Sequence, residues 1–300
     1  MNVKLGISAI NWLNEDRHLF KDLYTGEEVL SEMSKLGFEG TEMSRAFPRS
    51  VHELKALLSS KGLSLASGWK SVLFSDPSRR QTEMKAYREH VDFLKAMGCK
   101  HVVTCEIRNQ FTGPDRSKMV SLSDEEWKYM VDGLHEAGRY CRENGMELVY
   151  HFHGETVVET PEEIHKLVEM TDPEHVHLLY DTGHAYYGGS DPLELLKTYY
   201  DRIRYIHLKD VRQDVLNWTR LYRVKFSHAV KKGIFTVPGD GCIDFIPIFQ
   251  KLIERQYEGW LVIEAEQNPL TANPFAYAFK GKQYIEEVIE KVRQQTDLSD

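Results

Sequence analysis

Short apolar runs alternate with longer amphipathic segments along the whole chain. Eight of these runs are typical of buried strands, and they lie at Leu5–Ile10, Phe38–Met43, Leu63–Trp69, His101–Glu106, Leu148–His153, His177–Asp181, Arg204–Lys209 and Trp260–Glu264. Between them apolar residues recur at helical spacing, as at Val29, Leu30, Met33 and Leu36. Eight strands that alternate with helices in a chain of 300 residues predict a parallel α/β architecture.

Local signals mark where the helices begin and end. Ser123 with Glu126, and Thr160 with Glu163, have the spacing of a capping box at a helix start. Glycines placed just after a predicted helix and just before the next strand indicate helix ends. These glycines are Gly37, Gly62, Gly98 and Gly145.

Two parallel α/β architectures fit this pattern, a doubly wound sheet and a closed barrel. Polar side chains at the carboxyl ends of the predicted strands decide between them. A doubly wound dinucleotide fold would need a GxGxxG turn after the first strand, and none is present. Chemically reactive residues instead follow many different strands: Glu42, Trp69, Glu106, His151, His153, Asp181, His207 and Glu264. A closed barrel directs all of these ends to one mouth. We therefore predict a (β/α)8 TIM barrel, α/β in class, as a single catalytic domain over residues 1–300. The long connections Arg108–Leu122 and Val211–Ile243 are expected to cover its mouth.

Composition and charge limit the classes of partner that the protein is expected to bind. The net charge of −8 argues against nucleic acid or an anionic membrane as the main partner. No apolar stretch approaches the ~20 residues of a membrane span, and the first residues do not resemble a signal peptide. The four cysteines form no CxxC pair, so we expect free thiols in a cytoplasmic protein. The oligomeric state stays open, with a homo-oligomer as one alternative.

Strand periodicity places three of the polar residues on one face. Because side chains alternate along a strand, Asp181, His207 and Glu264 point inward if their strands line the barrel, with His151 at the same height and His153 one layer farther out. Two carboxylates and one or two imidazoles suit Mn²⁺, Co²⁺, Fe²⁺ or Zn²⁺ better than Mg²⁺. Each residue also has a structural alternative: Asp181 as a helix N-cap, His207 as a core histidine and Glu264 as an ion-pair partner. Their joint occurrence at three consecutive strand ends favours a metal site.

Two further residues are candidates for a supporting role. His184 could hydrogen-bond a ligand or the substrate, or it could face solvent at a helix start. Lys209 could bind a substrate oxygen, or it could form an ion pair with a neighbouring carboxylate.

The strand-end motifs resemble a known family. The segments Leu179–His184, Ile206–Asp210 and Ile263–Glu264 are similar to those of xylose-isomerase-like barrels. Within that superfamily the chain most resembles the inosose dehydratases, on four segments: Leu148–His151, Val176–Ala185, Phe235–Phe245 and Gly259–Gln267. This resemblance extends over nearly the whole chain.

The resemblance implies a metal-dependent lyase that removes water from a cyclic polyol ketone, converting scyllo-inosose (2-keto-myo-inositol) to a trihydroxycyclohexane-dione in inositol catabolism. The implied cofactor is one divalent ion, Mn²⁺ or Co²⁺, with Zn²⁺ and Fe²⁺ as alternatives, held by His151, Asp181, His207 and Glu264. We expect an enediolate stabilised by the metal, followed by β-elimination. Glu264 or His151 would remove the proton, and His153, His184 or Lys209 would protonate the departing hydroxyl.

Several residues depart from the family pattern at the predicted mouth. The family commonly has Gly-Gly where this chain has Ser44-Arg45, and it tends to have Phe at the position of Lys70. Small polar residues are expected where this chain has Ile107-Arg108, and the order Gly154-Glu155 also differs. These changes add bulk and charge but leave the metal set intact. The predicted substrate-binding residues are Glu42, Arg45, Trp69, Lys70, Glu106, Arg108 and Lys209. Two other reactions on the same scaffold remain alternatives: a ketose isomerase or epimerase, and a β-eliminase of a 3-keto-glycoside.

Overall fold

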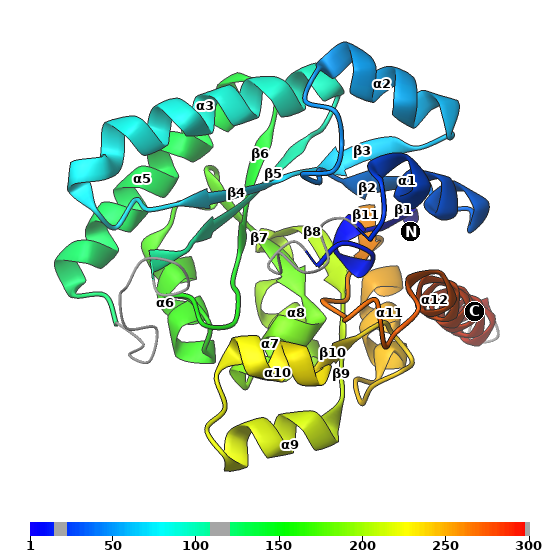
Figure 1. The fold of residues 1–300 in the computed structure, drawn as a ribbon. Helices are drawn as coiled ribbons and strands as arrows, with labels where there is room; N and C mark the ends of the chain where they lie inside the picture. The colour runs from blue at the N-terminus through cyan, green and yellow to red at the C-terminus, as the bar shows by residue number, and fades with distance from the viewer. Residues whose placement is uncertain (15–22, 109–120, 298–300) are drawn as a thin grey trace.

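The computed structural model describes residues 1–14, 23–108 and 121–297, and it forms a parallel barrel surrounded by helices (Figure 1). The strands are β1 (Asn2–Ile7), β2 (Gly40–Glu42), β3 (Ser64–Ser67), β4 (Trp69–Val72), β5 (His101–Glu106), β6 (Glu147–His151), β7 (Val176–Asp181), β8 (Ile203–Leu208), β9 (Asp210–Val211), β10 (Phe235–Thr236) and β11 (Glu258–Ile263). The helices are α1 (Gly26–Lys35), α2 (Val51–Ser60), α3 (Arg80–Met97), α5 (Asp124–Glu143), α6 (Pro161–Met170), α7 (Thr182–Gly188), α8 (Pro192–Tyr199), α9 (Gln213–Leu221), α10 (Phe226–Lys232), α11 (Phe245–Glu254) and α12 (Pro274–Asp297).

The main sheet closes on itself through a divided third strand. Its order is β3-β2-β1-β11-β8-β7-β6-β5-β4, and all of its pairs are parallel. The two edge strands β3 and β4 are consecutive in the chain, with only Gly68 between them. They therefore act as one strand that pairs with β2 in its first half and with β5 in its second. The predicted (β/α)8 barrel is confirmed, although most of the predicted strands differ from the observed ones by a few residues at their ends.

The barrel interior contains its own small apolar cluster. Its members are Ala66, Val103, Val149, Leu179, Tyr205 and Val262, with Trp260 packed against them. Leu179, Tyr205 and Val262 each lie two residues before Asp181, His207 and Glu264 on the same strand face. This arrangement confirms the predicted alternation, and it carries the three polar side chains into the barrel just above an apolar floor.

Helix termini follow the chemistry expected from the sequence. Capping boxes are present at Ser123 with Glu126 and at Thr160 with Glu163. The four glycines predicted to end helices all have positive φ, between 69° and 87°. At Gly98 the positive φ ends α3 and turns the chain toward β5, since the left-handed conformation is readily accessible to glycine.

Of the two long connections that are predicted to cover the mouth, the structure describes only one in full. Most of Arg108–Leu122 lies outside the described residues. The connection Val211–Ile243 contains α9 and α10 and a short antiparallel pair, β9 with β10 (Figure 1). Its helix α10 places Phe226 against His153 and His184, so the second connection packs beside the site, but none of its residues lines the cavity.

All four cysteines are free; Cys242 is exposed and the other three are buried. Among the described helices, none is long and apolar enough to cross a membrane.

Candidate metal centre

Asp181 ends β7 and serves two functions with its two carboxylate oxygens. Its Oδ1 accepts a hydrogen bond of 2.8 Å from the backbone N–H of His184, which caps α7. The N-cap interpretation is therefore correct for this oxygen. Its Oδ2 is buried and has no hydrogen-bond partner among the described residues. A buried carboxylate oxygen is costly without a partner, so Oδ2 is suited to bind a cation or to accept from a donor.

His207, on β8, directs its Nδ1 toward Asp181. Its Nε2 lies 3.0 Å from Oε1 of Glu42, and since an ionised carboxylate can only accept, Nε2 carries the proton. In the neutral ring this leaves a lone pair on Nδ1, which is buried and lacks a hydrogen-bond partner in the described part of the chain. That nitrogen lies 3.5 Å from Asp181 Oδ2 and 3.4 Å from Glu264 Oε2.

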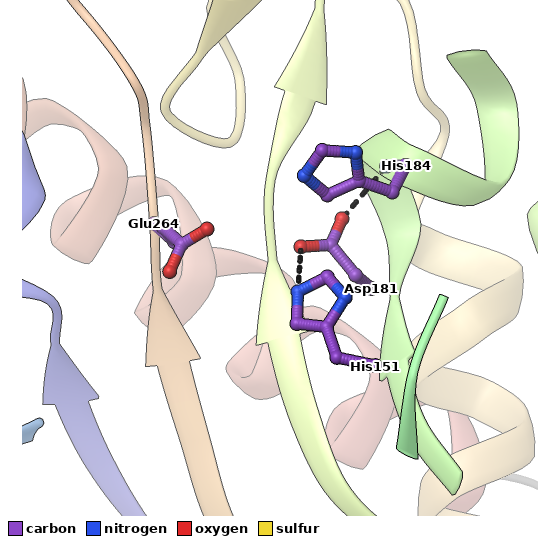
Figure 2. Close-up of side chains that lie close together, drawn as sticks. All are labelled: His151, Asp181, His184 and Glu264. Atoms are coloured by element: carbon purple, nitrogen blue, oxygen red, sulfur yellow. Dashed lines mark hydrogen bonds and ion pairs between the residues drawn. The ribbon is translucent and has the colours of Figure 1, made fainter. Parts of the chain in front are cut away.

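His151, at the end of β6, is oriented in the same way. Its Nδ1 donates to the carbonyl oxygen of Phe152 at 2.6 Å, because a carbonyl can only accept. The neutral ring therefore presents the Nε2 lone pair to Asp181 Oδ2, 3.6 Å away. Figure 2 shows His151 and Asp181 in contact, with Glu264 facing them from just beyond the end of β11. A histidine whose second nitrogen is held by a carbonyl is typical of metal ligands.

Three contacts among these side chains have the spacing of ligands around one divalent ion, although the atoms that all lie within 4.8 Å of one another belong to His151, Asp181, His184 and Glu264, and His207 groups with Glu42 and Glu264 instead. The contacts of 3.4, 3.5 and 3.6 Å join acceptor atoms to one another, and ligands at about 2.1 Å from a tetrahedral metal stand roughly 3.4 Å apart. Burial disfavours a charged His207, but Glu42 and Glu264 outweigh it and hold its pKa well above the usual range. The position thus attracts positive charge.

Lys209 is the positive charge that pairs with the carboxylates of this cluster. Its ammonium is fully buried and lies 2.7 Å from Glu264 Oε1, 2.8 Å from Glu266 Oε1 and 3.6 Å from Asp181 Oδ2. Burial opposes the charged form of Asp181, yet Lys209 outweighs it and keeps the pKa of that carboxyl well below its usual range. Lys209 does not line the cavity. Of the two roles expected for Lys209, the geometry therefore supports the ion pair with neighbouring carboxylates. It does not support a contact with the substrate.

A second layer of polar side chains lies just outside the four acceptors. The rings of His153 and His184 lie 3.8 Å apart between centroids, and Phe226 packs on both. His184 is buried, with Nδ1 accepting from the Gly154 N–H at 3.2 Å and Nε2 3.3 Å from Glu266 Oε1. His184 lies close enough to His151, Asp181 and Glu264 to be considered as a ligand. Because both of its nitrogens are engaged, it fits a supporting role better.

A cavity of about 570 Å³ opens above the cluster. Of the predicted site residues it is lined by Glu42, Arg45, Trp69, Lys70, His153, His207 and Glu264. Trp69 forms part of the wall, with its ring 5.5 Å from His151 and 5.7 Å from His153. The cavity therefore joins two of the candidate metal ligands, His207 and Glu264, to the predicted substrate-facing rim.

Two predicted substrate-binding residues lie elsewhere. Glu106 is on the face of β5 opposite Val103, so it points away from the barrel interior and accepts from the N–H and hydroxyl of Ser75 at 3.1 Å each. Burial raises the pKa of Glu106 to about 7. Arg108 forms an ion pair with Glu126 at 2.6 Å and is not part of the cavity lining. Neither prediction is supported, because strand alternation and a neighbouring acid direct both side chains away.

The sequence did not indicate four residues of the site. Glu266 shares the inward face of Glu264 and could have been included on that ground. Arg49 and His90 line the cavity but come from a loop and a helix. Phe226 reaches the site from α10. Short-range periodicity contains no signal for the last three, because their positions depend on how distant elements pack.

Glu159 stabilises the backbone that holds α10 in place. The N–H of Phe226 donates to Glu155 Oε1 at 2.5 Å, and the N–H of Glu155, whose φ is +60°, donates to Glu159 Oε2 at 2.5 Å. Burial raises the pKa of Glu159 from 4.5 to about 7. The folded protein therefore binds a proton more tightly here than the unfolded chain does, and this carboxyl makes stability fall as pH rises from about 4.5 to about 7.

We expect Glu159→Gln to remove that loss, because glutamine keeps an acceptor for the Glu155 N–H without a charge. Relative to the unaltered protein, the free energy of unfolding should rise by roughly 1–3 kcal/mol at pH 8 and change little at pH 5. Urea unfolding at the two pH values measures the difference. Glu162→Gln, three residues away and exposed, is the control and should show no such pH-dependent gain. An equal gain in both variants would contradict the assignment.

Comparison with known proteins agrees with the fold and the motifs. Residues 30–294 match the family described as xylose isomerase-like TIM barrel. The chain is 51% identical over 291 residues to an inosose dehydratase of Geobacillus kaustophilus (strain HTA426), covering 95% of this chain and 94% of that protein. It is 45% identical to an inosose dehydratase of Clostridium perfringens (strain 13 / Type A) over 290 residues, covering 95% of this chain and 97% of that protein.

A solved structure of IOLI protein with a bound zinc atom matches the fold with a TM-score of 0.72 at 17% identity, over 96% of this chain and 99% of that one. The family match and the curated relatives carry the assignment. The chain belongs to the inosose dehydratase family of the xylose isomerase-like TIM barrels.

Proposed function

We propose that the protein is a metal-dependent hydro-lyase that removes water from scyllo-inosose to give a trihydroxycyclohexane-dione. The observation that carries this proposal is the 51% identity to an inosose dehydratase along 95% of the chain. The buried acceptor atoms at the barrel mouth support the metal requirement independently of that likeness.

Four residues would hold the ion: His151 through Nε2, Asp181 through Oδ2, His207 through Nδ1 and Glu264 through Oε2. When bound, a divalent metal supplies Lewis acidity that polarises a ketone and stabilises an enediolate. Mn²⁺ or Co²⁺ suits the mixed carboxylate and imidazole donors, and Zn²⁺ or Fe²⁺ is compatible with them. The carboxylate of Glu42 would fix the ring of His207 through its Nε2–H, which is a different function from the predicted substrate contact.

His153 is the residue that we assign to proton transfer. Its Nδ1 donates to the Gly154 carbonyl at 2.9 Å, so the neutral ring has its lone pair on Nε2, and the residue lines the cavity. Burial, with His184 next, holds the pKa of His153 well below its usual range, which keeps it neutral and able to accept a proton. In this proposal Glu264 and His151, expected from the sequence as bases, would serve as ligands instead.

His153 alone can carry out both proton transfers of the proposed elimination. Nε2 takes the proton from the carbon beside the ketone, and the electrons of that C–H bond form the enediolate. The C–O bond on the next carbon then breaks, and its hydroxyl leaves as water with the proton from His153. The resulting enol becomes the dione by tautomerisation, in which the proton of the enol hydroxyl is lost and a carbon is protonated. Glu266, 3.9 Å from Nε2, faces the imidazolium and stabilises it. Trp69 and Phe226 enclose His153 with apolar rings, which limits access of bulk water.

Product analysis of purified protein tests the function. The protein is stripped of metal, reloaded separately with Mn²⁺, Co²⁺ and Zn²⁺, and given scyllo-inosose. We expect a diketone absorbance that appears only after reloading. No conversion under any of the metals would overturn the dehydratase proposal. Full activity in the stripped protein would overturn the metal requirement alone.

Glu42→Gln tests the support of His207. Glutamine can still accept from the His207 Nε2–H but removes the negative charge, so the imidazole becomes a weaker donor to the metal. Substitutions of this kind lower metal affinity by about 10–100-fold. Competition with a fluorescent chelator measures the Mn²⁺ affinity. Glu53→Gln, on the exposed side of α2, is the control and should bind Mn²⁺ as the unaltered protein does.

A further inference from the structure

The side chain of Trp69 reaches the cavity because the strand before it is irregular. Ala66 belongs to the apolar cluster inside the barrel, and Trp69, three residues later, lines the cavity. Regular alternation would place residues three apart on opposite faces of a strand. The irregularity lies in the pairing of β3 with β2, where two consecutive residues of β2 pair with Leu65 and Ser67 and Ala66 is passed over. Such an extra residue redirects the side chains that follow it, as bulges beside active sites do.

His90, on α3, contacts this irregular segment from the helix layer. Its Nε2 lies 3.2 Å from the carbonyl oxygen of Gly68, the single residue between β3 and β4. Because a carbonyl can only accept, Nε2 carries the proton and donates it. The absence of a side chain at Gly68 admits the ring, since a Cβ there would lie 3.3 Å from His90 Cε1 and 3.1 Å from the Cβ of Met43. Gly68 directly precedes Trp69, so this bond holds the backbone where the direction of the indole is set.

The indole of Trp69 is held at a second point, by Ser71. Its Nε1 donates to the Ser71 Oγ at 2.7 Å, which engages the only polar group of the ring. The side chain is 38% exposed and lies beside His151 and His153, so it presents apolar surface to the cavity next to the reacting groups. Apolar aromatic surface suits the C–H faces of a polyol ring whose hydroxyls project from its edge. An indole that is fixed before the substrate arrives binds it without a further loss of side-chain entropy.

We infer that His90 is a positioning residue for substrate binding, which fixes Trp69 through the Gly68 carbonyl so that the indole meets the ring of a cyclic polyol ketone. The inference rests on the proposed function for the identity of that ring. It assigns a residue of the helix layer, outside the metal cluster, to substrate recognition. Burial is the largest cause that lowers the pKa of His90, to about 4, so the ring is neutral between pH 5 and 8 and its bond to Gly68 is the same throughout.

Kinetics of the Mn²⁺-loaded protein with scyllo-inosose test this role. In His90→Leu the KM should rise about three- to tenfold, which is the value of one neutral hydrogen bond. The kcat and the Mn²⁺ affinity should stay unchanged, because the reacting groups and the metal ligands are not altered. His52→Leu, an exposed change on α2, is the control and should leave the KM unchanged.

Two amide variants identify the atom of His90 that acts. His90→Gln should restore most of the KM, since its amide nitrogen can take the position of Nε2 and donate to Gly68. His90→Asn places its amide nitrogen at the position of Nδ1 and should not restore it. An unchanged KM in His90→Leu would overturn the inference. Rescue by His90→Asn alone would also overturn it, because His90 would then act on the substrate directly.

The fluorescence of Trp69 gives a measurement that needs no turnover. The probe is scyllo-inositol, which has no ketone, and the difference from Trp69→Phe isolates the signal of Trp69 from that of the other tryptophans. We expect the probe to change this signal, with an apparent Kd about three- to tenfold weaker in His90→Leu and in Gly68→Ala, whose new methyl group would displace the histidine ring. The double variant should bind no more weakly than the weaker single variant, since both remove one contact.

Two outcomes of the fluorescence experiment would overturn the inference. One is a Trp69 signal that the probe leaves unchanged in the unaltered protein, and the other is a loss in the double variant equal to the sum of the single losses. Failure of the proposed function is seen separately, as no water loss from scyllo-inosose by an unaltered protein in which scyllo-inositol still changes the fluorescence of Trp69.

Discussion

Asparagine at position 181 is expected to give a folded protein that neither retains metal nor turns over substrate. The amide oxygen of Asp181→Asn can still accept from the His184 N–H and cap α7, which preserves the local fold. Its NH₂ group would replace Oδ2, the buried atom that faces both His151 and His207. An amide nitrogen donates hydrogens and offers no lone pair to a cation, so the ligand set loses its central member.

The expected loss is large because the metal would supply several kcal/mol of transition-state stabilisation, and about 4 kcal/mol is a thousandfold in rate. Metal content by mass spectrometry and turnover of scyllo-inosose measure the two consequences. Asp132→Asn, an exposed change on α5, is the matched control and should keep both. Normal metal content in Asp181→Asn would show that the ion, if any, is bound elsewhere.

The barrel could be predicted because each strand is a local pattern. Asp181, His207 and Glu264 each stand two residues after an inward apolar residue, and alternation alone transmits that direction along a strand. The same rule, applied consistently, would have excluded Glu106, which has the opposite parity to Val103 and points outward. It would also have included Glu266. These two errors concern application of the rule, since the necessary signal is in the sequence.

Other features depend on distances that no local pattern encodes. The roles of Glu42 and Lys209 follow from contacts across the barrel, to His207 and to Glu264 and Glu266 respectively. Arg49 reaches the cavity because of how the segment before α2 packs, and periodicity does not describe such packing. The sequence therefore predicts which residues enter the barrel better than it predicts their partners.

Replacing Lys209 by methionine is expected to destabilise the metal-free protein by about 3–5 kcal/mol, the cost of removing one partner from a buried ion pair. Methionine has a similar length but no charge, so Asp181, Glu264 and Glu266 would be left together with much less compensation. In the unaltered protein Lys209 opposes the effect of burial and lowers the pKa of all three carboxyls. Urea unfolding in the presence of a chelator measures the loss.

The sign of the pH dependence distinguishes this explanation from a simple loss of packing. A carboxyl whose folded pKa is lowered stabilises the protein above its unfolded pKa, near 4, and that contribution is lost as pH falls further. Without Lys209 the three carboxyls should have raised pKa values, because burial and mutual repulsion then dominate. The variant should therefore regain stability as pH is lowered from 8 to 5, whereas the unaltered protein should gain no such stability from these groups.

Two comparisons complete the test of Lys209. Lys197→Met removes an exposed lysine that is 2.8 Å from Glu194 on a helix surface, and it should cost no more than about 1 kcal/mol at either pH. Addition of Mn²⁺ should stabilise Lys209→Met, because a divalent ion among Asp181, His207 and Glu264 would neutralise part of the charge that Lys209 balances. A loss in Lys209→Met that is the same at pH 5 and pH 8 and unaffected by Mn²⁺ would contradict the electrostatic role and indicate that the side chain acts through packing alone.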